Sequence, residues 1–191
     1  MKNIILVVVI LSIINCKAQT NIMDMVNRCN SNSINHNNGS VYLKDISNVF
    51  NPYVGTWKWT EGSKEMTLTL IKQTKFHYNQ GTDNFYSDRL VGYYIYKENG
   101  VILANTSNDN LMDDYGLNVN FYMSCDSNLG TSSFTDVNKN KSYEVWLEMM
   151  SPTQFKFHGK IGESTYYRPK TGTIYYPAGT TFPLEMVFNK Q

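Results

Sequence analysis

The sequence predicts an all-β protein, a single antiparallel up-and-down β-barrel of about eight to ten strands. Three observations lead to this prediction. Apolar and polar residues alternate with a period of two through most of the chain after residue 50. No helical period of useful length interrupts this alternation. Turn signals separate the runs, and a long meander tends to close because closure removes exposed sheet edges.

Length and charge narrow the class of protein. The chain has 191 residues, which allows one domain and a short appendage. Basic and acidic residues number 17 and 16, and charged residues are only 17% of the chain. A nucleic-acid-binding surface needs clustered Lys and Arg, so this balance excludes it. The surface is therefore expected to be polar but mostly uncharged.

Residues 1–18 are predicted to be a signal peptide. Lys2 precedes an apolar run, residues 4–14, that is too short to span a bilayer. Two processing routes fit: cleavage before Cys16 with lipid attached to its thiol, or cleavage after Ala18. Asn15 stands where lipoprotein signals usually carry a small residue, so the choice stays open. Both routes predict export, to the periplasm, to an outer-membrane lipid anchor, or outside the cell, and membrane contact only through that anchor.

Residues 19–49 are predicted to be an Asn-rich N-terminal lead or tether, because such polar segments favour turns over packed elements. Cys29 lies in this lead and Cys125 in the domain. In an oxidising compartment the two form a candidate disulfide. Two unpaired thiols are the alternative, since a sequence does not show whether two Cα atoms lie within bridging distance.

The barrel domain is predicted over residues 50–191, and its strands follow from the alternation in order. An Asn99-Gly100 step suits a tight hairpin turn between two of them. Residues 150–153 form a second predicted turn. The predicted strands are residues 53–60, 66–70, 76–78, 90–96, 101–104, 117–123, 143–149, 155–157 and 184–188.

The segment Asn51-Pro52-Tyr53-Val54-Gly55-Thr56-Trp57 resembles the opening of lipocalin-type barrels. In that superfamily a Gly-x-Trp step on the first strand plugs one end of the barrel, which implies this role for Gly55 and Trp57. A late basic residue commonly packs over the tryptophan there. Arg168 and Lys190 both suit that cation–π contact here.

The whole chain is also similar to an uncharacterised family of small secreted or lipoprotein-like proteins of Gram-negative bacterial envelopes. The resemblance rests on Cys-Lys-Ala-Gln at residues 16–19, on residues 50–57, and on the terminal Pro183-x-x-Met186 strand. It implies export and a lipocalin-like barrel, and it implies no known activity.

No catalytic residue, metal site or cofactor is predicted. Nucleophile-elbow, phosphate-loop and paired-cysteine motifs are absent from the sequence, and His36, His77 and His158 lack the local spacing of a metal site. Two non-enzymatic functions fit better than an enzyme, which stays a third alternative and would need polar residues to meet inside the barrel. In the first, the barrel binds a small apolar or amphipathic ligand against inward-facing residues. The predicted lining is Trp59, Met66, Leu68, Phe121, Met123, Val145 and Leu147.

In the second, the core is solidly filled and the protein is an envelope interaction module. Its loops, especially residues 168–181, then contact a protein or glycan partner. An eight-stranded barrel is at the size where its interior can hold either side chains or a small ligand. The alternation of residues therefore does not choose between the two functions.

Overall fold

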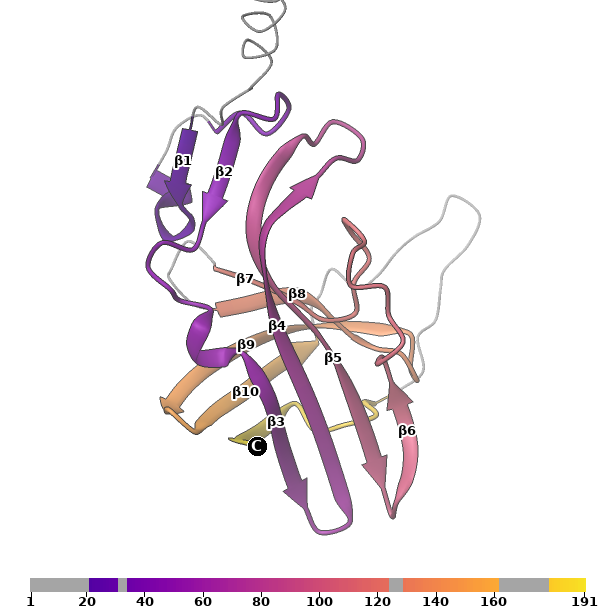
Figure 1. The fold of residues 1–191 in the computed structure, drawn as a ribbon. Coiled ribbons are helices and arrows are strands. Elements are labelled where there is room, and N and C mark those ends of the chain that lie inside the picture. Colours follow the sequence, from indigo (N-terminus) through magenta and orange to yellow (C-terminus); the bar gives the residue numbers. More distant parts are fainter. Residues whose placement is uncertain (1–20, 31–33, 124–128, 162–178) are drawn as a thin grey trace, which may run out of the picture.

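The computed structural model in Figure 1 describes residues 21–30, 34–123, 129–161 and 179–191. Within these ranges the chain forms eleven strands and two short 3₁₀-helices. In chain order they are β1 (Asn21–Asp24), η1 (Met25–Asn30), β2 (Val41–Lys44), η2 (Asn51–Tyr53), β3 (Gly55–Glu61), β4 (Lys64–Tyr78), β5 (Phe85–Glu98), β6 (Val101–Asn105), β7 (Asn120–Met123), β8 (Leu129–Asp136), β9 (Lys141–Ser151), β10 (Gln154–Ile161) and β11 (Glu185–Lys190).

The predicted fold class is confirmed, because eight of these strands close into an antiparallel barrel. The order around the barrel is β3, β4, β5, β7, β8, β9, β10 and β11. At one seam β11 returns to β3 through the pairing of Asn189 with Lys58. At the other, Leu90 of β5 pairs with Phe121 of β7. Closure pairs the strand edges that an open meander would expose.

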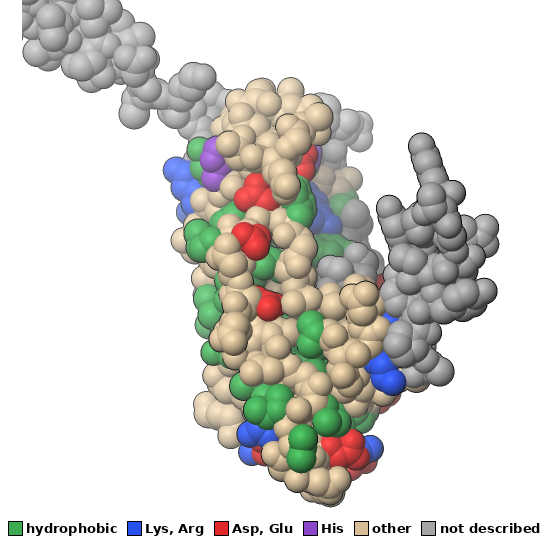
Figure 2. Space-filling view, turned by 90° about the vertical axis from the view of Figure 1, so that its right-hand side faces the viewer, with side chains coloured by type: hydrophobic (Ala, Val, Ile, Leu, Met, Phe, Trp, Pro, Cys, Tyr) green, Lys and Arg blue, Asp and Glu red, His purple; other side chains and the backbone are tan. Residues whose placement is uncertain are grey.

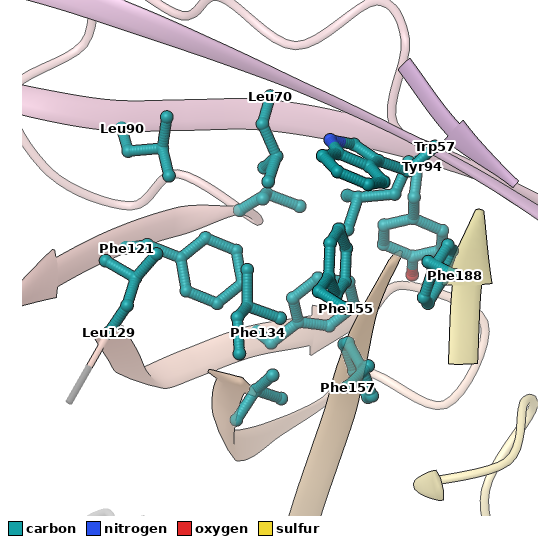
Figure 3. Close-up of a cluster of buried hydrophobic side chains, with 14 of the residues drawn as sticks. Trp57, Leu70, Leu90, Tyr94, Phe121, Leu129, Phe134, Phe155, Phe157 and Phe188 are labelled. Carbon is teal, nitrogen blue, oxygen red and sulfur yellow. The ribbon is translucent and has the colours of Figure 1, made fainter. Parts of the chain in front are cut away.

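Aromatic side chains from opposite walls meet inside the barrel (Figure 3). The Phe134 ring lies 5.2 Å from that of Tyr94, 5.1 Å from Phe157 and 5.9 Å from Phe182, measured between centroids. Each of these four side chains is at most 1% exposed. The period of two explains this arrangement, since alternate residues of a strand point to one face.

β4 and β5 form a hairpin longer than the barrel wall needs, and they are the two longest strands among the described residues. β5 shares one edge among three partners in succession: β2 at Tyr86 and Ser87, β7 at Leu90 and Val91, and β6 from Ile95 onward. The first part of β5 therefore extends beyond the barrel, with β2 and β1 beside it (Figure 1).

Asp45 links the N-terminal lead to the barrel through an ion pair and hydrogen bonds. It follows β2, its side chain is 0% exposed, and it accepts a hydrogen bond from Lys72 Nζ on β4 at 2.6 Å. The same carboxylate accepts the backbone N–H groups of Val49 at 2.7 Å and Phe50 at 3.2 Å. A buried charge is stable only when it is paired and hydrogen-bonded. Movement of the lead away from β4 would break this ion pair, so the pair stabilises the contact between the lead and β4.

A second buried carboxylate holds the chain just before β11. Asp136, 0% exposed, accepts hydrogen bonds from the Tyr143 hydroxyl at 2.9 Å and the Thr181 backbone N–H at 2.8 Å. The next residue, Phe182, inserts its ring between those of Tyr94 and Tyr143. This short segment therefore contributes an aromatic side chain to the barrel interior.

The strands differ from the predicted ranges at several places. β1 and β2 lie within the lead, for which no strand is predicted, and β7 begins at Asn120 rather than at residue 117. The strand predicted from residue 53 begins at Gly55, because Pro52 lies within the short helix η2. The predicted strands 66–70 and 76–78 are one strand, β4, interrupted by a bulge between Gln73 and Phe76. No pattern predicted β8, whose sequence Leu-Gly-Thr-Ser-Ser-Phe-Thr-Asp lacks a clear period.

The visible surface agrees with the composition. Figure 2 shows small hydrophobic and charged groups separated by uncharged polar surface. Among the described residues, no helix is long and apolar enough to cross a membrane.

Candidate functional site

A cavity of about 390 Å³ lies between the N-terminal lead and the extended part of the β4–β5 hairpin. This volume falls in the lower part of the range of small-molecule sites, about 300–1,000 Å³. The lead contributes Met25, Arg28, Cys29, Ile34, His36 and Leu43 to the lining, and Phe50 follows the lead directly. The strands contribute Tyr78, Phe85, Ser87, Asp88, Arg89, Asn120, Phe121, Tyr122 and Met123.

The bulge in β4 brings Tyr78 into the lining of this cavity. Before the bulge, Gln73 pairs with Arg89, and after it Phe76 pairs with Ser87. Arg89 and Ser87 lie two residues apart on β5 and so share one face. Thr74 and Lys75 stand opposite the single residue Asp88, so β4 has one extra residue here, and Lys75 has a positive φ. One extra residue shifts the alternation of β4 to the other face. Phe76 and the following aromatic residue, Tyr78, therefore lie on the face of β5 that carries Arg89.

Arg89 is a buried structural cation in the cavity lining. It is 2% exposed, and its guanidinium lies 3.2 Å from the centroid of the Phe76 ring. It donates hydrogen bonds to Gln73 Oε1 at 2.7 Å, to the Asp113 carbonyl at 2.8 Å and to the Leu111 carbonyl at 2.7 Å. These contacts tie the loop before β7 to the hairpin, and they use one donor on each guanidinium nitrogen.

The carboxylate of Asp88, the residue before Arg89, is also occupied by hydrogen bonds within the protein. Its carboxylate accepts hydrogen bonds from the Tyr42 hydroxyl at 2.6 Å, the Asp45 N–H at 2.9 Å and the Lys75 N–H at 2.8 Å. Burial, followed by the hydrogen bond to Asp88, raises the pKa of Tyr42 above its usual value. The Asp88 carboxylate thus joins β2, β4 and β5 at the cavity.

Arg28 differs from these two groups. It is half-buried on η1, and its guanidinium lies 5.2 Å from the centroid of the Tyr122 ring. The structure gives it no hydrogen bond or ion pair with any described residue. Burial lowers the pKa of Arg28, because a charged group loses favourable interactions with water there.

His36 supplies a further polar group. Its ring packs edge-on against Phe85 at a centroid distance of 4.6 Å. Its Nδ1 atom is buried, and no described residue forms a hydrogen bond with it. A neutral imidazole nitrogen can donate or accept a hydrogen bond, depending on the tautomer. The cavity therefore has a mainly apolar lining with polar groups at Arg28 and His36 that no described residue satisfies with a hydrogen bond.

Cys29 lies beside Arg28 in the same wall and is disulfide-bonded. Its predicted partner, Cys125, lies outside the described residues, so the Cys29–Cys125 pairing stays a prediction. Cys16, the predicted lipid attachment point, also lies outside them.

The predicted ligand-lining residues all belong to the buried core: Trp59, Met66, Leu68, Phe121, Met123, Val145 and Leu147. Two of them, Phe121 and Met123, also line the cavity described here. Sequence reasoning missed the contributions of Arg28, His36 and Arg89. No local pattern indicated them, because the cavity forms only where the lead lies against β5 and β7.

The Gly55–Trp57 step sits at the seam where β3 meets β11. Trp57 is 0% exposed, its Nε1 donates to the Tyr53 carbonyl at 2.7 Å, and its ring contacts Phe155 at 4.6 Å. Of the two candidate cations, Lys190 lies over this ring, with its Nζ 5.0 Å from the centroid. Arg168 lies outside the described residues. The plug role of Gly55 and Trp57 stays a prediction.

Fold and site together define a closed antiparallel eight-stranded barrel with a cavity beneath its N-terminal lead. The chain belongs to the Family of unknown function (DUF6705), whose model matches residues 1–191. No curated protein and no solved structure matches the chain.

Proposed function

We propose that this is an exported, non-enzymatic barrel protein that binds a small apolar or amphipathic ligand in the cavity beneath its lead. The observation that carries the proposal is the lining of this cavity. Leu43, Phe50 and Phe121 are buried apolar residues in it, and Arg28 and His36 supply polar groups. Small-molecule sites typically combine an apolar lining with a few placed polar groups.

Two features support export. The N-terminal eighteen residues have the charge and apolar pattern of a signal peptide, with Cys16 or Ala18 at the processing site. Cys29 is disulfide-bonded, and disulfides persist mainly in oxidising compartments such as the bacterial periplasm. Either a periplasmic location or an outer-membrane lipid anchor is consistent with both features. The mass of the mature protein, with or without an acyl addition at Cys16, distinguishes them.

Uptake of N-phenyl-1-naphthylamine, a neutral apolar probe whose fluorescence rises in apolar surroundings, tests the binding function. Ser87 lines the cavity and is 9% exposed, so Ser87→Leu places extra volume inside it. Ser63 is exposed in the turn between β3 and β4, and Ser63→Leu is the matched control. We expect uptake by the native protein and by the control, and loss of uptake in Ser87→Leu.

Both variants are checked for the native circular dichroism spectrum and melting temperature. If Ser87→Leu does not fold, Asn120→Leu, at a half-buried position of the lining, replaces it. Equal uptake by the native protein and a folded cavity-filling variant contradicts binding in this cavity. If the native protein takes up neither this apolar probe nor an amphipathic one, the proposed function is contradicted.

An envelope interaction module is the second candidate function. The aromatic packing inside the barrel favours it, as does an exposed apolar row on β6, where Val101, Ile102 and Leu103 are 60%, 53% and 37% exposed. Ile102→Glu should abolish capture of a protein or glycan from an envelope extract, whereas Glu61→Gln on a neighbouring hairpin should not. Equal capture by the two variants contradicts a role for β6.

A further inference from the structure

The charged side chains that line the cavity differ in the number of hydrogen bonds that they already form. Among the described residues, the lining carries two guanidinium groups, Arg28 and Arg89, and one carboxylate, Asp88. Asp88 already accepts three hydrogen bonds, from Tyr42, Asp45 and Lys75, and Arg89 already donates three. Of the three ionic side chains, Arg28 is the one without a hydrogen-bonding partner among the described residues.

Arg28 lies close to solvent, whereas most of the apolar residues of the lining are buried. Its guanidinium lies over Tyr122, which is 39% exposed, so this side of the cavity is close to solvent. Phe121, the preceding residue of β7, is 0% exposed, and Phe50, directly after the lead, is 1% exposed. The lining of the cavity therefore combines a half-buried cation with buried apolar side chains.

A half-buried cation with no anionic partner among the described residues has an incomplete set of contacts. Partial burial costs hydration free energy, and the face of Tyr122 returns only part of it through the cation–π contact. A carboxylate placed on the guanidinium would accept two parallel N–H donors in the arrangement that arginine favours. His36 Nδ1 offers a further polar atom in the same lining.

The same lining disfavours a cationic ligand. Asp88 is its only carboxylate among the described residues, and Asp88 is engaged by Tyr42, Asp45 and Lys75. A ligand ammonium group would meet Arg28 and Arg89 with no acidic side chain of the described lining free to receive it. A neutral ligand would not give the Arg28 guanidinium an anionic partner.

We propose that the ligand is an amphipathic monoanion, with its acid group on Arg28 and its apolar chain against Phe50 and Phe121. This inference rests on the proposed binding function and specifies the chemical class of the ligand. A fatty-acid-like carboxylate is the simplest molecule that has both parts.

Three probes with the same chain test the class: dodecanoate, dodecanol and dodecylamine, titrated below their aggregation concentrations at neutral pH and followed by calorimetry. We expect dodecanoate to bind about tenfold or more tightly than dodecanol, because hydrogen bonds between charged partners contribute more than neutral ones. Dodecylamine should bind most weakly. Equal affinity for the acid and the alcohol overturns the proposal.

Arg28→Gln tests the residue. It should weaken dodecanoate binding about tenfold and leave dodecanol binding unchanged, because only the acid uses the charge. Arg28→Lys keeps the charge but not the paired donors, and should give an intermediate loss. Lys44→Gln removes an exposed cation from the same lead and should change neither affinity. Tight dodecanoate binding that survives Arg28→Gln overturns the assignment to Arg28.

Uptake of the neutral naphthylamine probe separates the two proposals. If the native protein takes up this probe but does not prefer dodecanoate, the anionic class is wrong and the binding function stands. If it takes up neither, the binding function itself is contradicted. Circular dichroism spectra identify any Arg28 variant that has not folded, and the three-probe comparison on the native protein does not depend on those variants.

Discussion

Removal of the Asp45 carboxylate should detach the N-terminal lead from the barrel. Asp45→Ala eliminates the 2.6 Å contact with Lys72 Nζ, a hydrogen bond between charged groups that contributes about 1.5–3 kcal/mol. It also leaves the N–H groups of Val49 and Phe50 without their acceptor, at about 1 kcal/mol or more each. We therefore expect a loss of about 3–5 kcal/mol, the usual cost of breaking a buried ion pair.

Urea unfolding followed by tryptophan fluorescence measures this loss, because Trp57 and Trp59 are buried in the barrel and report its opening. Glu61→Ala is the control: Glu61 is exposed at the end of β3, and such substitutions usually change stability by less than about 0.5 kcal/mol. Uptake of the naphthylamine probe should fall with Asp45→Ala, since the lead forms one wall of the cavity.

Lys72→Met and the double variant complete a thermodynamic cycle. Lys72→Met alone leaves the Asp45 carboxylate buried without its counter-charge, so it should also destabilise the protein. The double variant should lose less than the sum of the two single variants, with a coupling free energy of about 1–3 kcal/mol. If Asp45→Ala costs less than about 1 kcal/mol and leaves probe uptake intact, the ion pair does not hold the lead in place.

Three further predictions concern the barrel itself. In Gly92→Ala the new Cβ would overlap the Thr69 carbonyl oxygen, so β4 and β5 cannot pair as they do; we expect no native circular dichroism spectrum. Phe182→Ala removes a side chain that is 1% exposed, and should lower the free energy of unfolding by about 3–5 kcal/mol in urea titrations. Burial raises the pKa values of Tyr94 and Tyr143, so both keep their protons in the folded state when the unfolded chain begins to lose them near about pH 10. The stability that these tyrosines contribute is complete below about pH 10 and should fall above it by about 1.4 kcal/mol per pH unit per tyrosine, measured by urea titration at successive pH values.

Each of these predictions has an outcome that would contradict it. A native-like Gly92→Ala protein would mean that β4 and β5 do not approach as closely as the structure shows. A loss below about 1 kcal/mol in Phe182→Ala would mean that its ring is not part of the core. A flat stability profile above about pH 10, with tyrosinate absorbance appearing in the folded protein, would mean that Tyr94 and Tyr143 are accessible to solvent.

The sequence by itself determined the fold class, and the reason is local. Each barrel strand must present apolar residues to one face, so a period of two shows wherever a strand has one buried face. Trp57 and Trp59 in β3, or Phe155 and Phe157 in β10, are examples. Asn99 and Gly100 both have positive φ and form the predicted tight turn, because that turn needs residues which tolerate such backbone angles.

The cavity was decided only by the tertiary structure. Arg28 and Phe121 are far apart in the chain, and they share a lining because β2 joins the free edge of β5 beyond the barrel. The bulge at Lys75 then turns the end of β4 toward that lining. Both effects depend on pairing between distant segments, which a local period does not record. A period shows which face of a strand is buried, whereas a binding site depends on which distant segment covers that face.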